Sequence, residues 1–168
     1  MADTQNDALF MENEEDTMHG KYLVFELDGQ EFAIGIRHVV DIINVQPITS
    51  VPACPDYVRG ITNLRGKVIH IIDVRMRFGK TPQEYNDRTC IIVVADGDTS
   101  VGLIIDSVSE VLSLDDEFVS PPPSFSDYSG AGFIAGVGRA ENGIKLILDY
   151  SSVLSDDRYV EPVGEFPA

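Results

Sequence analysis

The feature that most constrains this chain is a repeated pattern of short apolar runs separated by turns that contain glycine. In the first run Leu23, Phe25 and Leu27 occupy alternate positions, as on one face of a β-strand. A turn and a second alternating run follow, and together they predict a hairpin. The same pattern predicts three further hairpins, and the four turns lie at Asp28-Gly29, Asn63 to Lys67, Asp96-Gly97 and Asn142-Gly143.

The number of short strands also predicts the fold class. Many strands joined by tight turns favour barrels or a sandwich over a parallel sheet covered by helices. Helix is predicted only over Asp73 to Phe78 and over Tyr150 to Leu154, where Ser151 or Ser152 could cap the first turn. We therefore expect a mostly β fold with little helix.

Two four-residue segments resemble each other. Val39-Val40-Asp41-Ile42 follows the first hairpin, and Val108-Ser109-Glu110-Val111 follows the hairpin around Asp96-Gly97. Each consists of an apolar residue, a spacer, an acid and an apolar residue. This echo is consistent with two related halves of the chain, although short similarities are common by chance among β-rich segments.

The two ends of the chain differ from its middle. Residues 1–20 hold six acids and no Lys or Arg, and they show no apolar period, which predicts a flexible acidic arm. Residues 155–168 form an acidic tail with four acids and one base. The ordered body is expected over residues 21–154, with proline-rich connections at Pro47 to Pro55 and at Pro121 to Pro123.

The net charge of −16 is unevenly distributed. The body contains 18 acids against 11 bases, so nucleic acid, whose binding needs a broad excess of Lys and Arg, is not an expected partner. The segment from Arg59 to Lys80 reverses this balance, because Asp73 is its single acid. It predicts a basic patch for docking a partner, and its bases are Arg59, Arg65, Lys67, Arg75, Arg77 and Lys80.

Membrane insertion and secretion are not expected. The longest uncharged apolar run, Cys90 to Ala95, is far shorter than the roughly 20 residues of a membrane helix. The chain does not open with a basic segment followed by an apolar stretch, so no signal peptide is predicted. Cys54 and Cys90 do not form a disulfide framework. These features predict a cytoplasmic protein.

Residues that could support catalysis or hold a metal are scattered. Neither cysteine has a spaced Cys or His partner. His38 has no ligand-spaced neighbour, His19 falls in the acidic arm, and His70 is expected on a strand surface. A small enzyme with a catalytic Cys or His is the contrasting hypothesis. No nucleophile, base and orienting group can be assembled, so no enzymatic activity, metal or cofactor is predicted.

The segment Arg59 to Gly79 contains residues that core building does not require. Gly60 and Gly66 suit turns or close approach of the backbone. Asn63 can stabilise a turn through its side-chain carbonyl. Arg65, at the predicted hairpin tip, would present a planar guanidinium to a partner carboxylate. On spacing alone a solvated Arg65 is favoured over a binding residue.

The string RGITNLRGKVIHIIDVRMRFG, preceded by VPACPDYV and followed later by VGLIIDSVSEVL, resembles the CheW family of bacterial chemotaxis adaptors. The resemblance covers about residues 21–154. It implies two packed five-stranded SH3-like β-barrel subdomains, intertwined, with a boundary near residue 86. This chain departs from the family pattern at Pro47 and at His70.

The resemblance also implies a function. Members of the family are not enzymes; they link the cytoplasmic tips of transmembrane chemoreceptors (methyl-accepting chemotaxis proteins) to the histidine kinase CheA, whose regulatory domain has the same fold. The chain is then expected at the inner face of the membrane, within receptor arrays, without inserting into the membrane. A CheV-like or CheA-regulatory-type barrel module is the alternative. The residues that match the family's receptor-docking motifs are Gly60, Asn63, Leu64, Arg65, Gly66, Val108, Glu110 and Val111.

Overall fold

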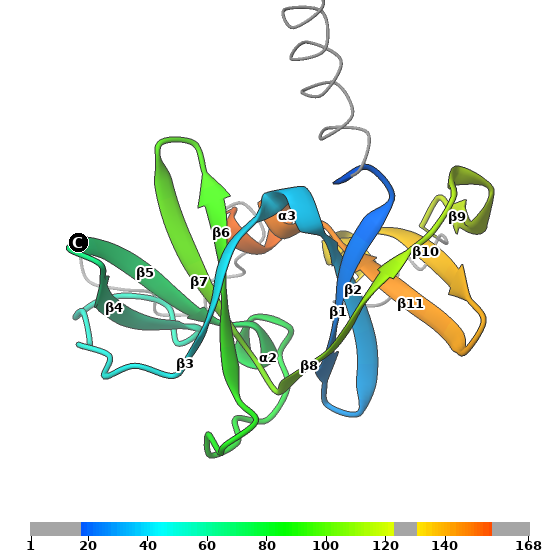
Figure 1. Ribbon diagram of the computed structural model, residues 1–168. Coiled ribbons are helices and arrows are strands. Elements are labelled where there is room, and N and C mark those ends of the chain that lie inside the picture. Colours follow the sequence, from blue (N-terminus) through cyan, green and yellow to red (C-terminus); the bar gives the residue numbers. More distant parts are fainter. Residues whose placement is uncertain (1–17, 123–130, 156–168) are drawn as a thin grey trace, which may run out of the picture.

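The computed structural model describes residues 18–122 and 131–155, which form two β-sheets with little helix (Figure 1). The mostly β prediction is confirmed. The strands are β1 (Lys21–Leu27), β2 (Gln30–Gly35), β3 (Val39–Asn44), β4 (Val58–Leu64), β5 (Lys67–Asp73), β6 (Cys90–Asp96), β7 (Thr99–Ile105), β8 (Ser107–Ser113), β9 (Val119–Ser120), β10 (Ile134–Ala140) and β11 (Gly143–Leu148). The helical pieces are η1 (Ile36–His38), α2 (Val74–Arg77), η2 (Asp116–Phe118), η3 (Ala131–Phe133) and α3 (Tyr150–Leu154).

All four predicted hairpins are present, as β1–β2, β4–β5, β6–β7 and β10–β11. Sheet A has the strand order β8-β1-β2-β11-β10-β9, and sheet B has the order β3-β6-β7-β5-β4. Two details differ from the expected five-stranded barrels. The two-residue strand β9 gives sheet A a sixth strand, and within the described residues no ladder joins the outer strands of either sheet. Neither sheet therefore closes into a barrel through hydrogen bonds.

The chain passes between the sheets through two crossings. After β1 and β2 in sheet A, the short turn η1 carries the chain to β3 in sheet B. After β6 and β7 in sheet B, Asp106 leads directly to β8 in sheet A. The crossing strands are the two segments that echo each other in sequence. Residue 86, near which a boundary between subdomains was expected, lies in the connection between β5 and β6, two strands of sheet B.

The two sheets repeat one arrangement. Replacing β1, β2, β8, β11 and β10 of sheet A by β6, β7, β3, β5 and β4 gives the order of sheet B. Both sheets contain one parallel pair, β2 with β11 and β7 with β5. Both have a register shift at a glycine, between Val58 and Gly60 and between Ile134 and Gly136. The structure is thus a pseudo-twofold repeat in which sheet B is built from the continuous stretch β3 to β7, while sheet A combines β1 and β2 with β8 to β11.

The largest apolar core lies between the sheets. Leu23 and Phe25 of sheet A belong to the same buried cluster as Ile92 and Leu103 of sheet B. Each sheet also has a smaller cluster of its own, one around Ile69, Ile71, Ile91, Val93 and Ile104 and the other around Val24, Ala33 and Ile147. Burial of one shared apolar core favours a fixed arrangement of the two sheets.

The helices α2 and α3 are also equivalent, because each follows the last strand of a hairpin. Asp73 caps α2 by accepting a hydrogen bond from the backbone of Met76, and Asp149 caps α3 by accepting from the backbone of Ser152. The prediction that Ser151 or Ser152 caps α3 is therefore wrong. An aspartate at this position accepts from the free amides of the first turn better than a residue inside the helix can.

The predicted basic patch is not a continuous surface, because two of its arginines are buried. Arg75 donates to Asp106 over 3.0 Å and to Asp28 over 3.2 Å, and it also donates to the carbonyl of Thr81. Lys80 pairs with Asp28 as well. Hydrogen bonding to Asp106 outweighs burial and raises the pKa of Arg75. This cluster ties α2 to the β1–β2 turn and to the crossing at Asp106.

Arg77 is the second buried arginine of α2. It donates to the carbonyls of Val153 at 2.9 Å and Ser155 at 2.6 Å, at the end of α3. Its guanidinium also lies 4.4 Å from the ring centroid of Tyr57 and 4.9 Å from that of Phe133. Since α2 follows sheet B and α3 follows sheet A, Arg77 connects the two sheets rather than serving a docking surface.

Replacing Arg77 by Met tests this role. Methionine retains a long aliphatic side chain but lacks the guanidinium, so the carbonyls at the end of α3 are left without a charged donor. We expect the free energy of unfolding to fall by about 2–4 kcal/mol in urea denaturation. The exposed Arg88, replaced by Met, should change it by less than about 0.5 kcal/mol. Equal effects of the two substitutions would contradict the connecting role.

Tyr85 anchors the connection between α2 and β6. Its hydroxyl donates to Asp73 Oδ2 over 2.9 Å, and burial, followed by the charge of Asp73, raises the pKa of Tyr85 to about 12. The contribution of this group to stability is present below pH 10 and is lost as the pH rises through 12. We expect tyrosinate absorbance to show one late-titrating tyrosine. That component should disappear in Tyr85→Phe; its persistence would assign the late titration to another tyrosine.

Candidate docking surface

The tip of the β4–β5 hairpin is a two-residue turn made by Arg65 and Gly66. Leu64 pairs with Lys67 across the ladder, and the backbone φ angles are 53° at Arg65 and 85° at Gly66. Two positive φ angles are the mark of a type I′ turn, which matches the twist of the strands. Asn63 supports the turn, since its Oδ1 accepts a hydrogen bond from the amide of Gly66 at 2.9 Å. The expected role of Asn63 in a turn is confirmed.

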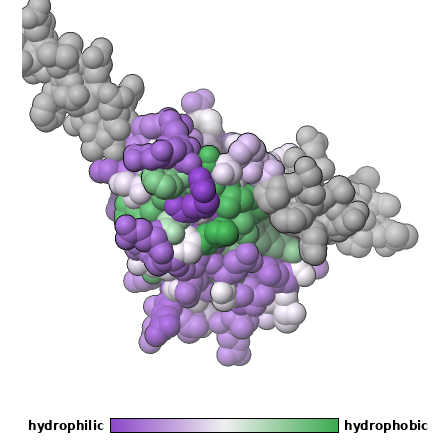
Figure 2. All heavy atoms as spheres, turned by 90° about the vertical axis from the view of Figure 1, so that its right-hand side faces the viewer, coloured by the Kyte–Doolittle hydropathy of each residue, from purple (hydrophilic) through white to green (hydrophobic). Residues whose placement is uncertain are grey.

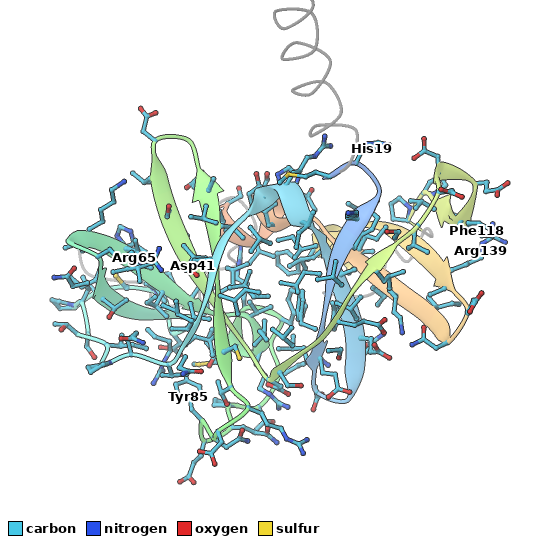
Figure 3. All side chains as sticks on the ribbon, in the orientation of Figure 1. His19, Asp41, Arg65, Tyr85, Phe118 and Arg139 are labelled. Atoms are coloured by element: carbon cyan, nitrogen blue, oxygen red, sulfur yellow. The ribbon has the colours of Figure 1, made fainter. Side chains whose placement is uncertain are left out.

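The turn presents Arg65 to solvent beside strand β3. The side chain of Arg65 is 79% exposed, and its Nη2 lies 3.0 Å from Asp41 Oδ2 (Figure 3). That oxygen is buried and accepts no well-aligned hydrogen bond from the described residues. The contact is therefore an ion pair by distance but not a well-directed hydrogen bond. Asp41 is therefore not firmly hydrogen-bonded to Arg65, and the exposed guanidinium of Arg65 can pair with a second carboxylate.

Sequence reasoning did not include Asp41 among the site residues. The signal that could have identified it is the echo between the two crossing strands, because Asp41 occupies the position that Glu110 occupies in β8. Glu110 was selected from the family pattern, and its counterpart was not. Asp41 therefore joins Arg65 in the candidate docking surface.

Gly60 has a structural reason of its own. It has a φ of 140°, and a Cβ there would lie 2.0 Å from the carbonyl oxygen of Thr49. Thr49 exchanges two backbone hydrogen bonds with Ile61, and Thr62 Oγ1 donates to the carbonyl of Pro47. The chain around Pro47 thus lies directly against β4. Gly60 is buried beneath it, so a glycine at this position has a structural reason.

Leu64 contributes mainly to packing, although it lies beside the exposed Arg65. It is half-buried and packs against the small cluster of sheet B. The exposed apolar side chains of these strands are Val68 on β5, at 66% exposure, and Val40 and Ile42 on β3. Ile42 directly follows Asp41 on β3, so its side chain lies on the opposite face of the strand from the Asp41–Arg65 contact.

Val108, Glu110 and Val111 lie on β8, in sheet A. Val108 packs against the core between the sheets, while Val111 is 56% exposed. Glu110 accepts a hydrogen bond from Asn142 Nδ2 at 3.2 Å, across to the tip of the β10–β11 hairpin. The structure therefore separates the predicted residues into two groups on different sheets.

The two groups are related by the pseudo-twofold repeat but differ in charge. The tip residues Arg65 and Gly66 of sheet B correspond to Glu141 and Asn142 of sheet A. The pair of opposite charges at Asp41 and Arg65 is thus replaced by two acids, Glu110 and Glu141, with Asn142 beside them. The same backbone presents two chemically different surfaces.

The surface of sheet A is also hollowed. A groove of 760 Å³ runs between β8 and the β10–β11 tip, with Glu110, Leu112, Phe118 and Arg139 among its lining residues. Phe118 is 41% exposed, and Arg139 donates to the carbonyl of Glu117 at 2.8 Å. Figure 2 shows apolar side chains gathered in the middle of this side of the molecule, with polar side chains around them. Such a rimmed apolar area is typical of protein interaction surfaces.

The described residues offer little for catalysis. They contain no group of three or more His, Cys, Asp and Glu side chains that could hold a metal. Cys54 and Cys90 are free, and His70 is exposed on β5. No helix in the described part of the chain is long and apolar enough to cross a membrane. What the surface can do is bind, through exposed apolar side chains beside charged ones.

Comparison with known proteins decides the family. The CheW-like domain matches residues 21–158 of this chain. The chain belongs to the CheW family. It is 32% identical to the chemotaxis protein CheW of Klebsiella aerogenes over 142 residues, which cover 84% of this chain and 86% of that protein. It is also 32% identical to CheW of Bacillus subtilis, over 82% of this chain and 88% of that protein.

A solved structure agrees with this assignment. The scaffolding protein TtCheW from Thermoanaerobacter tengcongensis superposes with a TM-score of 0.76 at 28% identity, over 83% of this chain and 95% of that protein. The CheW family consists of chemotaxis scaffold proteins and not of enzymes. The predictions that the chain has the CheW fold and belongs to a family of proteins that are not enzymes are confirmed.

Gly60→Ala tests whether the close approach of the Thr49 carbonyl requires a glycine at this position. A Cβ against the Thr49 carbonyl, at a φ that side chains rarely adopt, should lower the free energy of unfolding by about 2 kcal/mol or more. Gly97→Ala is the matched control, because it has a φ of 62° and nothing within 4 Å of the added carbon. It should cost only about 1 kcal/mol. Equal losses in thermal or urea unfolding would show that the Thr49 contact is unimportant.

Proposed function

We propose that this chain is a chemotaxis adaptor that couples transmembrane chemoreceptors to the histidine kinase CheA by non-covalent scaffolding. Membership of the CheW family supports this proposal most directly. Its location is then cytoplasmic, at the inner face of the membrane within receptor arrays. The alternative, a CheV-like or CheA-regulatory-type module, is not favoured, because the curated relatives at 30–33% identity over most of the chain are named as CheW proteins.

The receptor is proposed to dock across the two crossing strands. β3 and β8 are outer strands of their sheets, so each leaves one edge unpaired within the described residues. Val40 and Ile42 on β3 and Val111 on β8 are exposed apolar residues, between 41% and 58% accessible. An amphipathic helix from the receptor tip would cover apolar side chains of this kind. Arg65 would then pair with an acid of the receptor, with Asn63 and Gly66 fixing its position.

Glu110 would supply the corresponding contact on sheet A. Its carboxylate is held by Asn142 and lies in the open groove, so it could accept a hydrogen bond from a basic side chain of the partner. Opposite charge requirements at the two crossing strands would fix the direction of a bound helix. Gly60 and Leu64 contribute to this site by holding the β4–β5 hairpin in place.

The regulatory domain of the kinase is proposed to dock on the ends of the sheets. That domain is expected to have the same fold, and β-barrels of one kind can pair end to end. Val68 on β5 and Ile144 on β11 occupy equivalent positions next to the two hairpin tips, and both are more than 60% exposed. Exposed apolar residues of this kind provide the central contacts of such an interface.

Arg65→Glu tests the receptor contact. Reversing the charge beside Asp41 should weaken recruitment by a receptor fragment by about tenfold or more, while binding to the kinase regulatory domain stays largely unchanged. Affinity for each partner can be measured with purified components. Arg88→Glu is the control, since it makes the same charge change on an exposed turn outside the surface. Equal loss of both partners by a folded Arg65→Glu protein would contradict the division of surfaces.

A further inference from the structure

The hairpins β4–β5 and β10–β11 end in nearly the same sequence. β5 lies parallel to β7 in sheet B, and β11 lies parallel to β2 in sheet A (Figure 1). In these registers Ile71-Ile72-Asp73 at the end of β5 is equivalent to Ile147-Leu148-Asp149 at the end of β11. Both aspartates cap the helix that follows. The ends of the two strands therefore give little preference for one sheet over the other.

One buried position of these strands differs in its chemistry. Lys145 on β11 is fully buried, at 0% exposure, and lies two residues before Ile147, so both side chains point to the same face of the strand. Its counterpart on β5 is Ile69, which is 2% exposed and packs in the apolar cluster of sheet B. Sheet A thus buries a lysine where sheet B buries an isoleucine. A lysine is almost never fully buried unless it is paired.

The partner of Lys145 is Glu31 on β2. Lys145 Nζ lies 2.9 Å from Glu31 Oε1, and the Glu31 side chain is 32% exposed while that of Lys145 is 1% exposed. Glu26 lies directly opposite Glu31 in the β1–β2 ladder. Like charges in this position repel each other. Lys145 therefore supplies the positive charge that two facing acids of sheet A require.

Sheet B has no acid at the equivalent place. Glu31 immediately precedes Phe32, where the β2–β11 ladder begins, and Ser100 immediately precedes Val101, at the same point of the β7–β5 ladder. Ser100 is therefore the counterpart of Glu31. The residue opposite Ser100 is Ala95, so the counterpart of Glu26 is uncharged as well.

Exchange of the two hairpins would be unfavourable on both sides. With β11 beside β7, Lys145 would enter the apolar cluster of sheet B with Ser100 as its neighbour. With β5 beside β2, Ile69 would leave Glu31 and Glu26 facing each other without a cation. Separating a buried pair leaves an uncompensated charge, which costs more than the pair contributes when it is intact.

We propose that the Lys145–Glu31 pair determines which strand the β10–β11 hairpin joins, by favouring β2 and disfavouring β7. A buried ion pair adds little net stability compared with apolar side chains of similar volume, and its best-documented use is to select one arrangement among several. Sheet A needs this selection because its last hairpin follows the whole of sheet B in the chain. The inference concerns assembly of the fold and does not depend on the proposed coupling of receptors to a kinase.

The test converts the pair of sheet A into that of sheet B. Lys145→Ile with Glu31→Ser, in the full chain, is refolded from urea and compared with the wild type by amide NMR. The wild type should give one set of signals, with nuclear Overhauser contacts between Leu146 and Phe32. The double variant should fold but give a second set, in which Leu146 contacts Val101. We expect the mispaired fraction to rise by about a hundredfold or more.

Two further proteins control for the chemistry of the change. Glu31→Lys with Lys145→Glu keeps a pair of opposite charges and should give one set of signals. Lys67→Ile with Glu84→Ser makes the same types of substitution at exposed positions and should also give one set. A second set of signals in either control would contradict the proposal.

Two results for the double variant itself would overturn the proposal. A single set of signals with the Leu146–Phe32 contact would show that the pair is not needed for the choice of strand. Loss of folding would show that the pair is required to form sheet A at all, rather than to select the partner of β11.

Discussion

The apolar core between the two sheets is the interaction on which the rest of the structure depends. Phe25 and Phe32 stack with 5.9 Å between their ring centroids, and Phe32, Phe78 and Phe133 continue the row with spacings of 5.6 and 5.1 Å. This row runs from sheet A past α2 to η3. Sheet B is built from the continuous stretch β3 to β7, whereas sheet A combines β1 and β2 with strands that follow β7. Sheet A is therefore completed only after the chain returns from sheet B, so formation of the core and completion of sheet A are expected to be one cooperative event.

Local features of the sequence predicted the hairpins well. Interactions between residues far apart in the sequence could not be predicted from such local features. Alternation and turn residues act over a few neighbours, so the turn at Asn63 to Lys67 could be placed from sequence. Arg75 and Arg77 appeared to be surface cations because their partners are remote. Arg75 binds Asp106, 31 residues away, and Arg77 binds the carbonyl of Val153, 76 residues away. Burial of a charged residue depends on such partners, and a local count of charges does not contain them.

The candidate site was predicted in part, for a similar reason. Arg65 was correctly placed at a hairpin tip, and the family resemblance rather than the spacing selected it. Its neighbour Asp41 lies 24 positions earlier in the sequence, on β3, the strand with which the chain enters sheet B. Gly60 was selected as a docking residue, yet the Thr49 carbonyl explains why a side chain is not tolerated there. In the proposed function, residues that share a motif thus serve the same surface in different ways, Arg65 by contact and Gly60 by backbone shape.

The pseudo-twofold repeat explains how one small fold can offer two different surfaces. The proposed function requires two unlike partners to be held in a fixed relation, and a duplicated backbone with a shared core would supply that relation. Specificity then requires the duplicated positions to diverge. Arg65 corresponds to Glu141, so the two hairpin tips favour partners of opposite charge, while Asp41 and Glu110 conserve an acid on each crossing strand. The repeated backbone therefore provides the common structure of the two surfaces, and the few exposed residues that differ between the repeats determine the chemistry of each surface.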